Sequence, residues 1–181
     1  TVPLLDILYG IMLPSGADAC YAVCNYVAGS EADFVTLMNQ KAQEIGMTAT
    51  NFANATGLQD ENHYSTCQDM AKLLEYAIKN DTFKTIFSTH IYTTKATSVH
   101  SAGIALSSTT FINLPSSTLD NGTTIIGGKT GYTDEAGHCL ASLAKDANGV
   151  EYILVTAGAA GDANATPHIT DAVTVYSQLP A

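Results

Sequence analysis

The stretch TTIIGGKTGYTDEAGHCLASLAKDANGVEYILVTAG, residues 123–158, decides the fold of this 181-residue chain. It holds three segments of strand length that are rich in apolar and β-branched residues, at 123–133, 138–145 and 150–158. The sequence DANG, residues 146–149, is typical of a tight turn between the last two segments. Together these features predict an antiparallel meander of three strands.

The segments on either side of this sheet predict helices, because their apolar residues recur every three or four positions. The predicted helices cover residues 3–13, about 20–27, 31–45, about 66–78 and 166–179. PLLDILYGIML, residues 3–13, is the most apolar of these segments and predicts a buried helix, with an inner face of Leu4, Leu5, Leu8, Ile11 and Met12. The 31–45 helix has its own apolar face, formed by Phe34, Leu37, Met38, Ala42 and Ile45.

Helices gather first and strands last, which indicates the α+β class and one domain for a chain of this length. We expect a helical part over about 1–88, a mixed part of strands and turns over about 89–165, and a C-terminal helix over about 166–179. The polar segment 48–66 within the helical part predicts an ordered loop.

The composition excludes several functions. Seventeen acidic residues against seven lysines, with no arginine, give a formal charge of -10, so we expect no nucleic acid partner. No apolar run reaches the roughly 18 residues that span a bilayer. The four cysteines lack the spacing of a metal site, and we expect free or buried thiols, no metal and no cofactor.

The GGKT sequence at residues 127–130 has a superficial likeness to a phosphate-binding loop. That loop requires Gly-x-x-x-x-Gly-Lys-Ser/Thr before a helix, whereas the first glycine position here is Thr123 and the following residues continue a strand. In a strand, Lys129, Thr130 and Gly131 place an ammonium and a hydroxyl beside a bare backbone edge. This arrangement would suit an extended peptide that ends in a carboxylate, but the tripeptide taken alone favours a surface strand with one solvated lysine.

Four segments of the chain, including the one that contains this tripeptide, form a recognisable pattern: LYGIMLPSGADA (8–19), MNQKAQEIGMTATNFANATGL (38–58), HYSTCQDMAKL (63–73) and GGKTGYTDEAGHCL (127–140). In order and spacing they resemble the serine-type D-alanyl-D-alanine carboxypeptidases, which are low-molecular-mass penicillin-binding proteins. The resemblance implies a β-lactamase/transpeptidase-like fold, in which an antiparallel sheet packs against a helical cluster. It also implies an extracytoplasmic location, with peptidoglycan stem peptides as substrates and β-lactams as inhibitors. Any membrane contact is then expected only through segments outside this chain.

The resemblance also implies roles for individual residues. Lys129, Thr130 and Gly131 match the Lys-Thr-Gly motif, where the lysine and the hydroxyl bind the terminal carboxylate of the stem peptide. The backbone N–H of Tyr132 would be an oxyanion donor. Ser15 matches the serine of the Ser-x-Asn motif, which relays a proton toward the leaving D-alanine.

Two departures from the family pattern are visible. Ala17 stands where the second motif has asparagine, so the amide that holds the substrate carbonyl is missing. The nucleophile motif, Ser-x-x-Lys, is expected several tens of residues before Ser15, and we therefore expect the domain to be incomplete at its N-terminus. The one match in the chain, Ser142 to Lys145, lies on a predicted strand, where residues three apart face opposite sides, and we reject it.

Three functions follow from these patterns. The first is a D,D-carboxypeptidase that acts through a serine acyl-enzyme, and this chain alone is then expected to be inactive. The second is a serine β-lactamase of the same fold, which requires a group that drives fast deacylation. The third is a non-catalytic module that binds peptidoglycan peptides, which the missing nucleophile and Ala17 would favour for the chain taken alone. A Ser-His-Asp triad has no support, because the five histidines are scattered.

Overall fold

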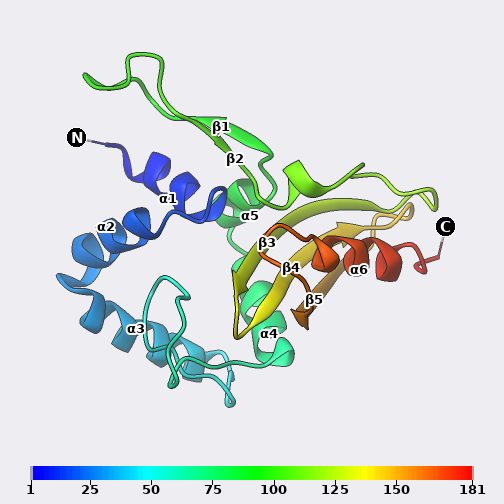
Figure 1. Ribbon diagram of the computed structural model, residues 1–181, viewed down its shortest axis with the longest axis horizontal. Helices are drawn as coiled ribbons and strands as arrows, with labels where there is room; N and C mark the ends of the chain where they lie inside the picture. The colour runs from blue at the N-terminus through cyan, green and yellow to red at the C-terminus, as the bar shows by residue number, and fades with distance from the viewer. Residues whose placement is uncertain (1, 181) are drawn as a thin grey trace.

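A three-stranded antiparallel sheet forms one side of the molecule in the computed structural model, which describes residues 2–180 (Figure 1). Its strands are β3 (Thr124–Thr133), β4 (Gly137–Lys145) and β5 (Glu151–Ala159), in the order β3-β4-β5. The predicted meander is confirmed, including the turn at 146–149, where the Asp146 carboxylate accepts hydrogen bonds from two backbone N–H groups. Because β3 lies at the edge of this sheet, the backbone on its outer side is available to a ligand.

Helices cover both faces of the sheet. Helix α6 (Pro167–Tyr176) packs on one face over a core that includes Ile125, Leu140 and Ala144. Helices α4 (Cys67–Ala77) and α5 (Asp81–Phe87) lie on the other face, where Leu74 and Phe87 contact Leu143. Residues of β4 thus alternate between two apolar layers, as a strand with both faces buried requires.

Helices α1 (Leu4–Met12), α2 (Ala17–Ala28) and α3 (Glu31–Glu44) form an arc opposite the sheet (Figure 1). The prediction of a buried first helix holds only in part, because Leu4 and Leu5 are 46% and 45% exposed. Leu8 and Met12 of the predicted face do pack inward, against a buried cluster that includes Tyr9 and Leu13, and Asp6 is buried beside them. The predicted α3 face agrees with the structure except at Leu37: Ala42 is buried and Phe34, Met38 and Ile45 are half-buried, whereas Leu37 is 45% exposed.

A hairpin of β1 (Ile91–Thr93) and β2 (Ala105–Ser107) projects beside α1 and explains why α1 turns Asp6 inward. The Asp6 carboxylate accepts hydrogen bonds from the Tyr92 hydroxyl at 2.6 Å and from the Lys95 backbone N–H at 3.0 Å. Tyr92 also stacks on Tyr9, with ring centroids 3.7 Å apart. The hydrogen bond between Tyr92 and Asp6, 86 positions apart in the sequence, therefore holds α1 where the sequence pattern predicted an apolar contact.

The remaining elements agree with the sequence in part. Thr66 caps α4 by accepting a hydrogen bond from the Asp69 N–H, and α6 ends at Tyr176, three residues before the predicted end. Helix α2 begins at Ala17, earlier than predicted, and α5, which Asn80 caps, was not predicted. All four cysteines are free thiols. Among residues 2–180, no helix is both long and apolar enough to cross a membrane.

Candidate active site

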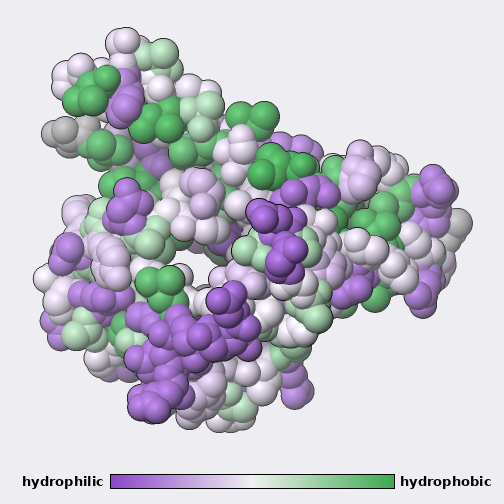
Figure 2. Space-filling view, in the orientation of Figure 1, coloured by the Kyte–Doolittle hydropathy of each residue, from purple (hydrophilic) through white to green (hydrophobic). Residues whose placement is uncertain are grey.

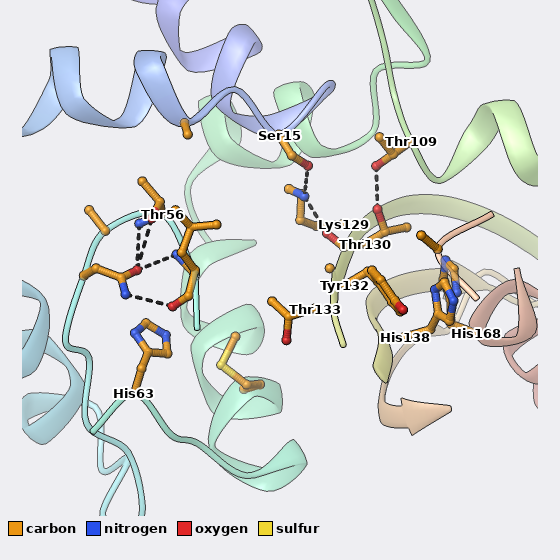
Figure 3. Close-up of a pocket in the computed structure, with 18 of the residues that line it drawn as sticks. Ser15, Thr56, His63, Thr109, Lys129, Thr130, Tyr132, Thr133, His138 and His168 are labelled. Carbon is orange, nitrogen blue, oxygen red and sulfur yellow. Dashed lines mark hydrogen bonds between the residues drawn. The ribbon is translucent and has the colours of Figure 1, made fainter. Parts of the chain in front are cut away.

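Lys129 joins the sheet to the helical arc at the centre of the candidate site (Figure 3). From the edge strand β3, its ammonium donates hydrogen bonds to the Ser15 Oγ and, at 2.6 Å, to the backbone carbonyl of Thr130. Ser15 precedes α2, 114 positions earlier in the sequence. The fold therefore brings together the two motifs that were predicted to share one site.

The turn before α2 holds Ser15 in a constrained conformation. Ser15 has a φ of 60°, and it is the one residue other than glycine with a positive φ among residues 2–180. The next residue, Gly16, donates its N–H to the Gly10 carbonyl at 3.0 Å, and a Cβ at this position would lie only 2.9 Å from that oxygen. A bare glycine therefore lets the turn close onto α1, and the closed turn holds the serine hydroxyl over β3. Such backbone strain is common at functional sites.

Burial changes the acidity of Lys129. It lowers the pKa of the ammonium from the ordinary value of 10.5 to about 8, because desolvation disfavours the charged form. The nearby Cys20 thiol acts in the opposite direction but more weakly. A lysine with this pKa is largely protonated at neutral pH and gains from a carboxylate that replaces its lost hydration.

A cavity of about 830 Å³ lies between the arc, the 52–58 loop and β3. All five sequence-predicted site residues line it: Ser15, Lys129, Thr130, Gly131 and Tyr132. Nothing would lie within 4 Å of a Cβ at Gly131, so the strand edge is open there. No aspartate or glutamate is among the lining residues of the described chain, although the protein carries seventeen of them. The cavity wall is therefore suited to an anionic group.

A second, more apolar cavity of about 590 Å³ lies between α4 and the sheet. Side chains such as Leu73, Leu74 and Val155 line it. Lys129, Thr130 and Gly131 line both cavities, so the apolar space reaches the candidate site.

Sequence reasoning missed three histidines that line the main cavity, His63, His138 and His168. The rings of His138 and His168 stack with centroids 4.9 Å apart, and Tyr132 lies 4.4 Å from His138 (Figure 3). His138 Nε2 donates to the Asp162 carbonyl at 2.8 Å, since a carbonyl oxygen only accepts. Burial and the neighbouring His138 lower the pKa of His168. No spacing signal connects β4 to α6, so the sequence alone could not pair these residues.

Ser142, which was rejected as a nucleophile, is completely buried in the core. Its hydroxyl donates to the Leu154 carbonyl at 3.3 Å and lies 3.0 Å from the Tyr176 hydroxyl, whereas Lys145 is exposed. The rejection is confirmed. Within residues 2–180, no group of three or more His, Cys, Asp or Glu side chains is arranged to hold a metal.

Comparison with known proteins places residues 1–161 within the family described as D-alanyl-D-alanine carboxypeptidase. The chain is 34% identical over 143 residues to D-alanyl-D-alanine carboxypeptidase DacF of Bacillus subtilis, which covers 79% of the chain and 35% of that protein. It is 37% identical over 145 residues to the D-alanyl-D-alanine carboxypeptidase of Streptomyces sp. K15, covering 77% of the chain and 49% of that protein. The chain thus spans about a third to a half of these relatives.

Solved structures show the same fold. The Streptomyces K15 DD-transpeptidase superimposes with a TM-score of 0.78 at 29% identity, over 95% of this chain and 66% of that one. A D-alanyl-D-alanine carboxypeptidase from Mycobacterium tuberculosis superimposes with a TM-score of 0.79 at 22% identity, over 96% of this chain and 62% of that one. The α+β, β-lactamase/transpeptidase-like fold predicted from the sequence is therefore confirmed.

Proposed function

Because the chain belongs to the D-alanyl-D-alanine carboxypeptidase family, we propose that the protein removes the terminal D-alanine from peptidoglycan stem peptides. The observation that carries the proposal is the contact between Lys129 on the open edge of β3 and Ser15, in a cavity without acidic side chains. The same site would bind β-lactams, which end in a comparable carboxylate. With this activity the protein would act on the outer side of the cytoplasmic membrane, where peptidoglycan lies.

Binding comes first in the proposed reaction. The stem peptide lies along the edge of β3, with its terminal carboxylate at the Lys129 ammonium and the Thr130 hydroxyl. A charge-assisted hydrogen bond of this kind is worth about 1.5–3 kcal/mol. The open backbone at Gly131 lets the peptide approach the strand closely. The N–H of Tyr132 then faces the scissile carbonyl and stabilises the developing oxyanion.

The chemical steps follow the serine acyl-enzyme scheme. A serine oxygen attacks the carbonyl carbon of the penultimate D-alanine, while a lysine accepts the serine proton. The C–N bond breaks, and the leaving amine receives a proton by way of the Ser15 hydroxyl. Water then hydrolyses the ester and restores the serine. We place the nucleophile and its base outside the 181 residues, because no Ser-x-x-Lys pair of this chain reaches the cavity.

The segment that carries the nucleophile would pack in the apolar cavity between α4 and the sheet. Its wall is largely apolar, so an apolar helix face would bury surface there. Its opening beside Lys129 and Gly131 would place one end of that segment next to the bound carbonyl. Ala17 would still lack the side-chain amide of the Ser-x-Asn motif. The substrate carbonyl would then be bound by backbone N–H groups alone.

The direct test is D-alanine release from an acyl-D-Ala-D-Ala peptide by the full-length protein, together with labelling by a fluorescent penicillin. We expect both activities from the full-length protein and neither from the 181-residue chain alone. Labelling of the isolated chain would show that the nucleophile lies within it and would contradict this account.

The same experiment separates the two alternatives. A non-catalytic module would bind the peptide, but would neither release D-alanine nor retain the label. A β-lactamase would lose the label within seconds, because its acyl-enzyme is hydrolysed quickly.

A further inference from the structure

Thr109, which follows β2, connects the two sides of the site through its backbone N–H and through its hydroxyl, which Figure 3 shows against Thr130. Its backbone N–H donates to the Leu13 carbonyl at 3.1 Å. Its own carbonyl accepts from the Asn113 side-chain amide at 2.9 Å. Its hydroxyl oxygen lies 2.6 Å from the Thr130 hydroxyl oxygen, a short hydrogen-bond distance.

These contacts close a circuit around the cavity mouth. Leu13 is the C-cap of α1 and lies two residues before Ser15, which accepts a hydrogen bond from Lys129. Lys129 is followed on β3 by Thr130, whose hydroxyl contacts the hydroxyl of Thr109. The backbone N–H of Thr109 in turn donates to the Leu13 carbonyl, which completes the ring of contacts. Thr109 therefore sets the separation between the Ser15 turn and the Lys129–Thr130 strand by a route that does not depend on the lysine side chain.

The proton count in the hydroxyl pair gives Thr109 a second role. A hydroxyl has one hydrogen and two lone pairs, so only one proton lies between the two threonine oxygens. A carboxylate only accepts hydrogen bonds, so the Thr130 hydroxyl must donate its one hydrogen to any carboxylate that it binds. The proton between the threonines must then come from Thr109. Each bond in such a chain polarises and strengthens the next.

We propose that Thr109 is a positioning residue, which donates to Thr130 and thereby aims the Thr130 hydroxyl at the terminal carboxylate of the substrate. The role rests on the proposed carboxypeptidase function. Thr109 lines the cavity, but the proposed role acts through Thr130 and requires no contact between Thr109 and the substrate. Its effect should therefore depend on whether the ligand carries a carboxylate, which a purely structural role would not require.

The test compares acylation of the full-length protein by benzylpenicillin and by its methyl ester, which lacks the negative charge. In Thr109→Val the shape of the side chain is kept and the hydroxyl is lost. We expect acylation by the acid to slow by about five- to tenfold, the loss typical of one hydrogen bond. Acylation by the ester should change less than twofold.

The neighbouring residue supplies a matched control. The hydroxyl of Thr110 is buried and has no hydrogen-bond partner among the described residues. Thr110→Val should leave acylation by both ligands unchanged, because no hydrogen bond is lost. Thr109→Ser keeps the donor and should restore most of the rate with the acid.

Equal losses with the acid and the ester would overturn the proposal, because they would show a structural effect on the whole site. An unchanged rate with the acid would also overturn it. If the wild-type protein is not acylated at all, the proposed function fails, and the dissociation constants of an acyl-D-Ala-D-Ala peptide and its C-terminal amide decide the role of Thr109. A loss in Thr109→Val confined to the free acid would support the role even then.

Discussion

The sheet and the arc of α1–α3 bury their apolar side chains to very different extents. Leu143 and Ala144 of β4 are completely buried between two layers of helices, whereas Leu4 and Leu5 of α1 remain almost half exposed. Hydrophobic residues come to the surface around α1 and the hairpin, and an opening separates the arc from the sheet (Figure 2). We therefore expect the sheet to contribute more to stability than the arc, which holds Ser15 in place through a few specific contacts.

The largest expected effect is on the sheet. Leu143→Ala should lower the free energy of unfolding by about 2–5 kcal/mol, because it removes a fully buried side chain and leaves a cavity. Chemical denaturation monitored by circular dichroism measures this change. The matched variant in the arc, Leu5→Ala, should stay within about 0.5 kcal/mol of wild type, since its side chain is 45% exposed. Equal losses in the two variants would contradict the division between sheet and arc.

An intermediate effect is expected where the arc meets the hairpin. Asp6→Ala removes the acceptor of the hydrogen bonds from the Tyr92 hydroxyl and the Lys95 N–H. It should lower the free energy of unfolding by about 1–3 kcal/mol. The loss should be local. Hydrogen exchange should accelerate in the 91–107 hairpin and remain slow in β4. Uniform acceleration across both regions would show that the arc and the sheet unfold as one unit.

A smaller effect, which depends on pH, is expected at the contact between the two regions. The pKa of Lys129 is lowered to about 8, so the ammonium loses its proton as the pH rises through this value. The affinity for a carboxylate ligand should therefore be constant below pH 8. Above pH 8 it should fall, by an amount that approaches tenfold per pH unit. Titration of an acyl-D-Ala-D-Ala peptide from pH 6 to 10 measures this dependence. Constant affinity up to pH 10 would contradict the assignment of Lys129 as the carboxylate partner.

The sheet could be predicted because its signals are local. Alternating apolar residues and the turn at 146–149 lie within one continuous stretch, and each strand pairs with the next. The arc could not be predicted as well, because its inner face depends on a partner far along the chain. Asp6 is buried only because Tyr92, 86 positions later, supplies a hydrogen-bond donor.

The site shows the same division. Lys129, Thr130, Gly131 and Ser15 could be identified only through the resemblance to a family, because the Lys-Thr-Gly tripeptide alone also fits a surface strand with a solvated lysine. Their catalytic roles remain predictions. Thr109 and the stack of His138 on His168 carry no sequence signal, because threonine and histidine at these positions match no motif. Their importance comes from contacts across 21 and 30 positions of the chain, which only the folded structure shows.

The most direct test of the site is the rate at which fluorescent penicillin labels the full-length Lys129→Met variant. We expect labelling about a hundredfold slower than in the wild type, because the variant loses a charge-assisted contact to the carboxylate. The control variant, Lys145→Met at the exposed end of β4, should be labelled at the wild-type rate. If Lys129→Met is folded and is labelled as fast as the wild type, the β3 edge is not the carboxylate site.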